Sequence, residues 1–362
     1  MEKFLGKGKV VLLFLVIAMI SLAAGCTKAA QPSPGTAGSA AAVKEGEFTI
    51  RLGHSNSTEE TNIITYASTY FKNRVEELTS KGIKVEIYPL NQLGSDGDQV
   101  TALQNGSQEM NYTAMTVVAP VCSPIYVYSL PYLFTDPNKV EASIKALWDK
   151  NNEWLIKRSN LRLLGYAVAG FRQLSTSSKY PVKDLASARG VKIRIPPNAI
   201  SEATFRKLGL EPVALPYSET FTSLQQGVAD AQENCLVAVR SDHFYEVQSY
   251  ISDINWQYNM GMFIMSEQFY QKLPQKYQEA VILAGKEMTD KVIAKFYESD
   301  ADDIQYLKET GKMQFLGMPT DYDKWVEVGK SVWEESYSVI GDGNVQTGKA
   351  IVDEVVDIIN RL

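Results

Sequence analysis

The chain has 362 residues with 36 basic and 42 acidic side chains, which gives a net charge of −6. Proteins that bind nucleic acid need a basic stripe, so this acidic balance argues against nucleic acid as a partner. Removing the first 25 residues, which contain three lysines and one glutamate, changes the charge to about −8.

The N-terminal segment has the pattern of an export signal. Three lysines precede an uncharged run over residues 10–24, which ends in the letters LAAGC. This run is shorter than the ~20 apolar residues that cross a bilayer, so a secretory signal over 1–25 is favoured over the alternative, an uncleaved anchor helix. The ending resembles the lipobox of bacterial lipoproteins, which implies a lipid on Cys26 and attachment to the outer face of the cell membrane, or a periplasmic location.

Residues 26–46 are rich in Ala, Ser, Gly and Pro and lack apolar periodicity, so they predict a flexible tether. Alternating apolar residues then predict a strand over 48–52. Ser57 and Glu60 have capping-box spacing before an apolar helical pattern that ends near Leu78. A second strand over 83–87 and a short helix after the turn PLNQLGSDGD follow. This alternation of strand and helix predicts a mostly parallel α/β sheet.

The same alternation returns after Leu161. The segments LRLLGYAVAG, GVKIRIP and NWQYNMGMFIMS predict strands, while helices are expected to open at Asn198 and Ser218. Pro274 opens a helical pattern of about 35 residues, which is too long for one small domain and is expected to run across two. The tail predicts one strand, GKMQFLG, and one helix, DKWVEVGKSVWEESYSVIG.

The sequence contains no recognisable catalytic or metal-binding motif. His54 and His243 have no HExxH, CxxC or GxSxG context, and GSDGDQ lacks the ligand spacing of a calcium loop. We therefore expect no catalytic residues, no metal, no cofactor and no enzyme activity. Cys122 and Cys235 are able to pair in an oxidising compartment, but two small buried thiols are the favoured interpretation.

Two arginines stand in consecutive apolar strands. Arg194 lies in KIRIPP and Arg172 in AGFRQLSTS, and a guanidinium is costly in such a place unless it meets an anion. Together they could bind one carboxylate in bidentate fashion; the alternative is a solvated face, since Lys192 shares the side of Arg194. Asn234 and Tyr217 follow strands at strand-to-helix boundaries, where α/β sheets place ligands, although a turn asparagine and a half-buried tyrosine are the simpler interpretations.

These residues belong to motifs that together resemble one family. The chain from about Phe48 onward resembles DctP-type solute-binding proteins of TRAP (tripartite ATP-independent) transporters. The resemblance rests on FKNRVEELTSKGIKVEIYPLNQLGSDGDQV, SLPYLF, GFRQLSTS, DLASARGVKIRIPPN, LGLEPVALPYSETFTSLQQGVADAQEN, FYEVQSYIS and SEQFYQKLP.

The resemblance implies a role for individual residues. Arg194 occupies the place of the arginine that forms the main salt bridge to the ligand carboxylate, and Arg172 that of an assisting arginine. Asn234 matches an asparagine that reaches the carboxylate or a nearby hydroxyl, and Tyr217 an aromatic residue that packs over the ligand. Contacts from the first lobe are expected from His54, Asn56 and Asp96.

Two departures from the family pattern flank Asn234. Ala231 replaces the usual glycine and Cys235 the usual proline, which predicts a different backbone and leaves the contact of Asn234 open. The implied fold class is α/β and periplasmic-binding-protein-like, with two lobes, a ligand cleft between them and a long helix spanning both. The implied lobes are 47–171 with 260–299, and 172–259 with 300–362.

The implied function is that of a monomeric receptor that binds a small organic acid by hinge closure and delivers it to membrane permease subunits. A ligand-sensing lipoprotein without transport and an exported α/β enzyme are the alternatives, while a sugar receptor of the ABC type is disfavoured. The ligand is expected to be a sugar acid, then a dicarboxylate, with keto and amino acids also open. Trp256 and Tyr258 favour a sugar acid, unless they are core residues.

Overall fold

The computed structural model describes residues 45–59 and 62–362. The predicted signal peptide over 1–25, Cys26 and all but the last two residues of the predicted tether over 26–46 lie outside the described residues. In the part of the chain that is described, no helix combines the length and the apolarity needed to span a membrane.

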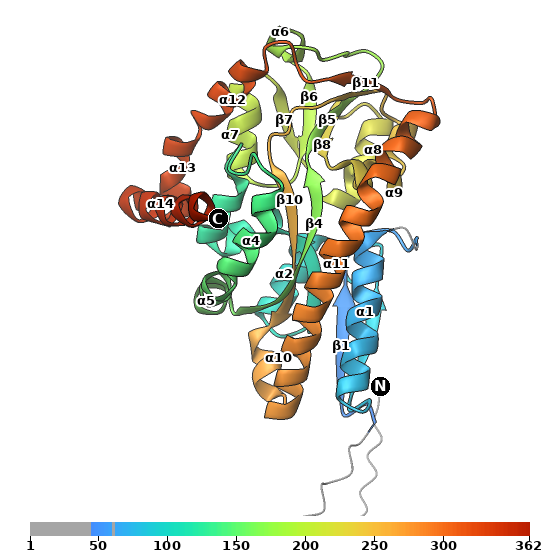
Figure 1. The fold of residues 1–362 in the computed structure, drawn as a ribbon, viewed down its shortest axis with the longest axis vertical. Coiled ribbons are helices and arrows are strands. Elements are labelled where there is room, and N and C mark those ends of the chain that lie inside the picture. Colours follow the sequence, from blue (N-terminus) through green and yellow to red (C-terminus); the bar gives the residue numbers. More distant parts are fainter. Residues whose placement is uncertain (1–44, 60–61) are drawn as a thin grey trace, which may run out of the picture. The chain divides into compact units, whose positions relative to one another are not determined.

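Lobe I is built on a five-stranded mixed sheet with the strand order β2-β1-β3-β10-β4. Figure 1 labels β1, β10 and β4 of this sheet. The strands are β1 (Phe48–Gly53), β2 (Ile83–Tyr88), β3 (Met110–Ala114), β4 (Leu161–Phe171) and β10 (Tyr258–Ser266). β1 pairs in parallel with β2 and β3, whereas β10 runs antiparallel to β3 and β4. The prediction of a mostly parallel sheet is therefore wrong for β10, because the chain leaves lobe I at the end of β4 and returns from lobe II at the same end.

Lobe II is built on a six-stranded sheet with the order β11-β9-β5-β8-β6-β7. β5 is antiparallel to both of its neighbours, and the other pairs are parallel. The strands are β5 (Gln173–Thr176), β6 (Lys192–Ile195), β7 (Glu211–Ala214), β8 (Ala231–Asn234), β9 (Tyr250–Ser252) and β11 (Gln314–Gly317). Two α/β lobes, each with its own sheet, agree with the fold class expected from the sequence.

Most of the described helices are short, and three of them have more than 12 residues. Between the strands of lobe I lie α1 (Ile63–Leu78), α2 (Asp96–Gln104), α3 (Met115–Val118), η1 (Ala119–Val121), η2 (Ser123–Ser129), α4 (Asn138–Ala146) and α5 (Trp148–Ser159). Between those of lobe II lie α6 (Leu185–Ala188), α7 (Ala199–Lys207), η3 (Tyr217–Glu219), α8 (Thr220–Gln225), α9 (Leu236–Ser241) and η4 (Phe244–Glu246). After β10 follow α10 (Glu267–Lys272), α11 (Gln275–Glu309), α12 (Tyr322–Lys330), α13 (Trp333–Ile340) and α14 (Val345–Arg361).

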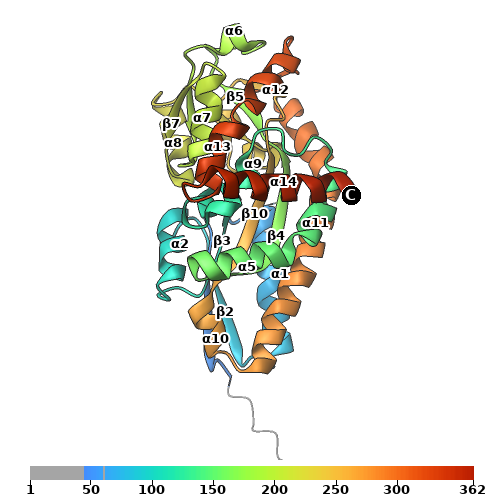
Figure 2. The ribbon, with the colours of Figure 1, turned by 90° about the vertical axis from the view of Figure 1, so that its left-hand side faces the viewer.

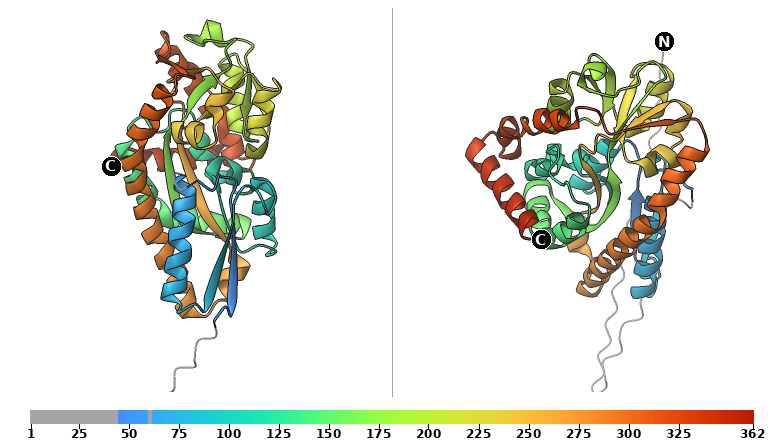
Figure 3. Two further views of the ribbon diagram at one scale, coloured as in Figure 1. Left: turned by 90° about the vertical axis from the view of Figure 1, so that its right-hand side faces the viewer. Right: turned by 45° about the horizontal axis from the view of Figure 1, so that its top comes forward.

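The long helix α11 joins the two lobes. Its 35 residues confirm the predicted length and correspond to about 50 Å. Figure 3 shows α11 beside α1, and it also contacts β4 of lobe I and α9 of lobe II. A Cβ at Gly285 would lie 2.0 Å from the carbonyl oxygen of Leu164, so only glycine allows α11 to approach β4 this closely.

The chain crosses between the sheets at two further places. Phe171 ends β4 and Gln173 begins β5, so Arg172 is the single residue between the two sheets. Residues 253–257 make the return crossing from β9 to β10. The two sheets are therefore joined by two strand connections and α11, the arrangement from which hinge motions are built.

Helix starts were predicted with mixed success. Asn198 caps α7, as predicted, because its side chain accepts from the backbone N–H groups of Ile200 and Ser201. The predicted start at Ser57 is wrong, since α1 begins at Ile63 and its cap is Asn62. The segment opened at Ser218 starts as the 3₁₀ turn η3 before it becomes α8.

The C-terminal helices extend from lobe II toward lobe I. Figure 2 shows α12, α13 and α14 following one another in this direction. Trp325 of α12 lies in a core cluster of lobe II, whereas Ile340, Val352 and Val355 lie in the core of lobe I. The sequence predicted a single helix here and did not predict α14. We therefore propose that lobe I also includes α13 and α14, in place of the predicted division that gave all of 300–362 to lobe II.

Candidate functional site

A cavity of about 420 Å³ lies between the lobes. Lobe I lines it with the loop after β1, the starts of α1 and α2, and the end of β3, and lobe II with the ends of β6 and β8, with η3 and with α9. Six of the seven predicted ligand contacts line it: Arg194, Arg172, Asn234, Tyr217, Asn56 and Asp96. These residues are far apart in the sequence, and the fold brings them together at the carboxyl ends of strands.

Arg194 is a buried cation on this cavity. Its side chain is 2 % exposed, so the interpretation of its strand face as solvated is wrong at this position, although Lys192 is exposed. Nε and Nη2 donate to the carbonyl oxygen of Leu215 at 3.1 and 2.7 Å. No carboxylate of the described residues forms an ion pair with Arg194. Burial lowers the pKa of Arg194 to about 10, which measures how poorly its charge is compensated.

Tyr217 holds one side of Arg194. The centre of its ring lies 5.7 Å from the guanidinium carbon, within the range of a cation–π contact. The Tyr217 hydroxyl donates to the Asp242 carboxylate, which fixes the ring. Burial raises the pKa of Asp242 to about 6, although its hydrogen bonds with Tyr217 and Ser241 act in the opposite direction.

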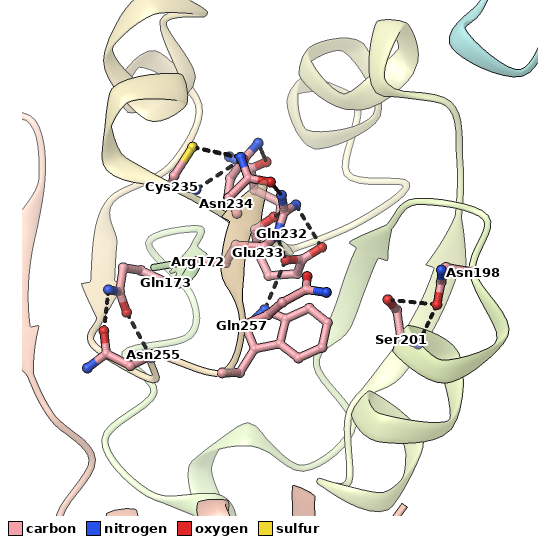
Figure 4. A network of polar contacts seen from close by, with 12 residues as sticks. Arg172, Gln173, Asn198, Ser201, Gln232, Glu233, Asn234, Cys235, Asn255 and Gln257 are labelled. Atoms are coloured by element: carbon pink, nitrogen blue, oxygen red, sulfur yellow. Dashed lines mark hydrogen bonds and ion pairs between the residues drawn. The ribbon is translucent and has the colours of Figure 1, made fainter. Parts of the chain in front are cut away.

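Arg172 has a different environment, because its charge is already neutralised. Its Nε and Nη2 donate to the carboxylate of Glu233, which is fully buried (Figure 4). Nη2 also donates to the Glu233 carbonyl at 2.9 Å, and Nη1 donates to Asn259 at 2.9 Å. These four bonds leave one of its five N–H groups for a solute.

The pKa of Arg172 agrees with the geometry of its ion pair with Glu233. Burial by itself lowers the pKa of Arg172, but the charge and hydrogen bonds of Glu233 outweigh this, so the net direction is upward. Trp256 adds a further hydrogen bond to Glu233, from Nε1 at 3.0 Å. Arg172 is thus neutralised by Glu233, whereas Arg194 has no ion-pair partner among the described residues.

Asn234 lies at the end of β8, and its side chain is hydrogen-bonded to neighbouring residues. Its Oδ1 accepts from the backbone N–H of Cys235 at 3.0 Å, and its Nδ2 lies 3.4 Å from the Gln232 side-chain oxygen. The Cys235 thiol accepts from Asn259 at 3.3 Å. The side-chain oxygen of Asn234 is therefore used by the backbone of Cys235, and its side-chain nitrogen by Gln232.

Asp96 is the first residue of α2 and belongs to lobe I. Its Oδ1 is buried without a hydrogen-bond partner among the described residues. Burial raises its pKa to about 6, against the lowering effects of a hydrogen bond from Ser55 and the charge of Arg194. Asp96 and Arg194 thus face one cavity from opposite lobes without forming an ion pair.

One of the seven predicted ligand contacts, His54, does not line the cavity, and neither do the two aromatic residues that favoured a sugar acid, Trp256 and Tyr258. His54 is fully buried behind the wall, and burial lowers its pKa to about 4, so its ring is neutral near pH 7. Trp256 and Tyr258 belong to the hydrophobic cores, so the suggestion that they contact a sugar is wrong. Large aromatic residues stabilise a core more often than a site, and the sequence does not separate the two uses.

The comparisons with known proteins agree with this geometry. Residues 52–339 match the family model DctP, bacterial extracellular solute-binding protein, family 7. The chain belongs to this family. A TRAP periplasmic solute-binding protein from Rhodobacter sphaeroides, in an open form without ligand, is 33 % identical with a TM-score of 0.70, over 86 % of this chain and 99 % of that one.

Two further structures of TRAP solute-binding proteins were solved with ligands. The protein from Sulfurospirillum deleyianum holds succinate; it is 26 % identical, with a TM-score of 0.79. The protein from Roseobacter denitrificans holds L-galactonate; it is 25 % identical, with a TM-score of 0.76. Each match covers 86 % of this DctP-family chain and 99 % of the other.

Several cavity residues of this DctP-family protein were not predicted. Thr113 and Asn259 line the cavity from β3 and β10, and Glu233 and Asp242 stand behind Arg172 and Tyr217. Glu233 lies inside the quoted motif that ends in DAQEN, and the other three lie in a strand or at a helix end with no motif of their own. Glu233 carried a usable signal, since a glutamate between two inward-facing residues of a buried strand needs a cation.

The cysteines and His243 of this DctP-family protein were also considered in the sequence as candidate functional groups. Cys122 and Cys235 are free and buried, which confirms the favoured interpretation. Within 45–59 and 62–362, no three His, Cys, Asp or Glu side chains are grouped as a metal site would require. His243 is not on a helix surface as expected; it has a left-handed backbone before η4 and lies 3.2 Å from Glu59 of lobe I.

Proposed function

We propose that this protein is the extracytoplasmic receptor of a TRAP-type transporter and binds the carboxylate of a small organic acid through Arg194. One observation carries the proposal: Arg194 is a buried guanidinium that faces a cavity without an acidic partner among the described residues. An uncompensated buried charge costs several kcal/mol, and a bound carboxylate removes this cost. A guanidinium binds a carboxylate through two parallel hydrogen bonds, which gives the contact strength and direction.

A sugar acid is the favoured solute, followed by a dicarboxylate. The DctP-family proteins with bound L-galactonate and succinate support both classes as ligands of this fold. The lobe I wall presents Asn56, Asp96 and Thr113, which suit the hydroxyl groups of a sugar acid. Apolar residues, among them Ile64, complete the wall and exclude water from the bound solute.

Binding is coupled to closure of the lobes. A solute that contacts both lobes has a higher affinity for the closed form and shifts the population toward it. In this structure the lobes already touch, since Asn198 donates to the Thr116 carbonyl at 3.0 Å and Asn62 lies 3.4 Å from the Ser241 hydroxyl. The closed, loaded receptor then docks as a monomer on the permease subunits. No bond of the solute is broken, so the protein is not an enzyme.

Lipid attachment is the remaining part of the proposal. A lipid on Cys26 would hold the receptor at the outer face of the membrane, close to the permease. More than one acyl chain is needed for stable attachment of this kind. Mass spectrometry of the N-terminal peptide from cells tests it, since a lipidated Cys26 carries acyl groups and an unmodified residue would contradict the assignment.

The solute is tested by thermal shift against a panel of organic acids and their neutral analogues. A ligand at 1,000 times its dissociation constant adds about 4 kcal/mol to the stability of the folded protein. For a chain of this size we expect the unfolding midpoint to rise by about 8 °C. A shift with an acid and none with its neutral analogue supports the proposal. Shifts with neutral sugars alone would contradict it.

A further inference from the structure

The charged groups of the cavity are few and unequal. Arg172, Arg194, Asp96 and Asp98 are the charged side chains in the described wall. Arg172 is neutralised by Glu233, and the Asp98 carboxylate is used by the backbone and side chain of Ser95 in a capping box. Two charges therefore remain for a solute: the cation Arg194 on lobe II and the carboxylate Asp96 on lobe I.

The lobe I wall lacks partners for its oxygens. Asp96 Oδ1 is buried and has no hydrogen-bond partner among the described residues, and the same is true of the Thr113 hydroxyl, whose side chain is 1 % exposed. A buried oxygen without a donor costs free energy comparable to a lost hydrogen bond. An ionised carboxylate only accepts hydrogen bonds. The unpartnered Asp96 oxygen is therefore satisfied by a donor from the solute, whereas the Thr113 hydroxyl is able to donate or to accept.

These observations define what the far end of the solute must carry. The solute carboxylate neutralises Arg194, so it leaves Asp96 without a cation nearby. A hydroxyl group near Asp96 donates to its oxygen and satisfies it. A second carboxylate in the same place has no proton to donate near pH 7, and two like charges repel strongly in a buried site.

We propose that Asp96 is the specificity-determining residue of this cavity, which selects a monocarboxylate with hydroxyl groups at its far end and rejects a dicarboxylate. The inference rests on the proposed function and goes beyond it, because family membership alone allows both solute classes. Asp96 contacts the far end of the solute, whereas Arg194 binds the carboxylate that both solute classes share.

The test uses pairs of six-carbon acids that differ at one end. Gluconate and galactonate end in a CH₂OH group, and glucarate and galactarate end in a second carboxylate in its place. Titration calorimetry at pH 7.5 measures the dissociation constant of each acid and of succinate with the full-length protein. We expect the better-binding monoacid to bind at least about 30-fold more tightly than its diacid, since buried hydroxyl readout and like-charge repulsion each give a tenfold effect or more.

Substitution of Asp96 should remove most of the preference for the monoacid over the diacid. Asp96→Asn keeps the size and removes the charge, so we expect the monoacid to lose about tenfold and the diacid to gain, bringing the two within about threefold. Asp353→Asn is the control, since this carboxylate lies on the exposed face of α14 beside Lys349 and away from the cavity, and it should leave the ratio unchanged. If Asp96→Asn fails to fold, Asp96→Ser carries the same expectation.

The outcomes separate this inference from the proposed function. A wild-type protein that prefers the diacids or succinate would overturn the inference and keep the receptor assignment. An Asp96→Asn variant that loses both acids of a pair equally would also overturn it, because Asp96 then has no selective role. If no organic acid binds, the inference and the proposed function fail together.

Discussion

The buried pair of Arg172 and Glu233 offers a quantitative test of the site's architecture. Glu233 is fully buried and accepts hydrogen bonds from Arg172 and, at 3.0 Å, from Trp256. In Glu233→Gln the amide has one acceptor oxygen, and its NH₂ group faces donors. Arg172 becomes an uncompensated charge, and its positive charge already lowers the pKa of Arg194.

Breaking one partner of a buried ion pair costs about 3–5 kcal/mol. A chain of this size loses roughly 2 °C of melting temperature for each kcal/mol, so Glu233→Gln should lower the midpoint by about 6–10 °C. Differential scanning calorimetry without solute measures this. Glu202→Gln is the control, since its pair with Arg206 at 2.8 Å lies on an exposed helix face and is worth about 0.3–0.5 kcal/mol. Equal, small shifts in both variants would refute the reasoning.

Two further predictions concern the lobe contact and the pH dependence. Gly285→Ala forces a Cβ against the Leu164 carbonyl and should lower the free energy of unfolding, measured by chemical denaturation, by at least about 1–3 kcal/mol. Gly97→Ala is the control and should not lower it, because its Cβ meets no atom within 4 Å. Equal effects of the two substitutions would contradict the close approach of α11 to β4. Burial raises the pKa of Asp96 and of Asp242 to about 6, so both carboxylates are more easily ionised in the unfolded chain. The stability of the solute-free protein should therefore fall as pH rises from about 4 to 6 and level off above that. The melting temperature across pH measures this, and the fall should be smaller in Asp96→Asn. Identical profiles of wild type and variant would contradict the raised pKa of Asp96.

The sequence predicted which residues line the site better than it predicted which side chains pair with one another. Arg194 was identified because a guanidinium in an apolar strand needs an anion, and that argument depends only on local alternation. Arg172 satisfied the same argument, but its anion is Glu233, which is 61 residues away. The two meet because β5 pairs with β8, with Gln173 opposite Asn234, and strand pairing is not visible in a single sequence.

Local signals also misplaced some boundaries and contacts. Ser57 has capping-box spacing, yet Asn62 lies directly before two buried isoleucines and is the actual cap of α1. Aromatic residues such as Trp256 fit either a core or a sugar site by composition, and only the packing of the folded chain decides. The burial of His54 has the same origin, because the loop after β1 is covered by residues distant in the sequence.

The most direct test of the central claim measures the coupling between Arg194 and the solute carboxylate. Dissociation constants are determined for wild type and Arg194→Met, each with the acid that the panel identifies and with its uncharged amide. Removing one partner of a buried charge pair costs about 2–5 kcal/mol, so Arg194→Met should weaken the acid by about 30-fold or more. The amide should change by less than about threefold, while circular dichroism shows that the variant remains folded. Equal weakening of acid and amide, or retention of the acid by Arg194→Met, would contradict the account.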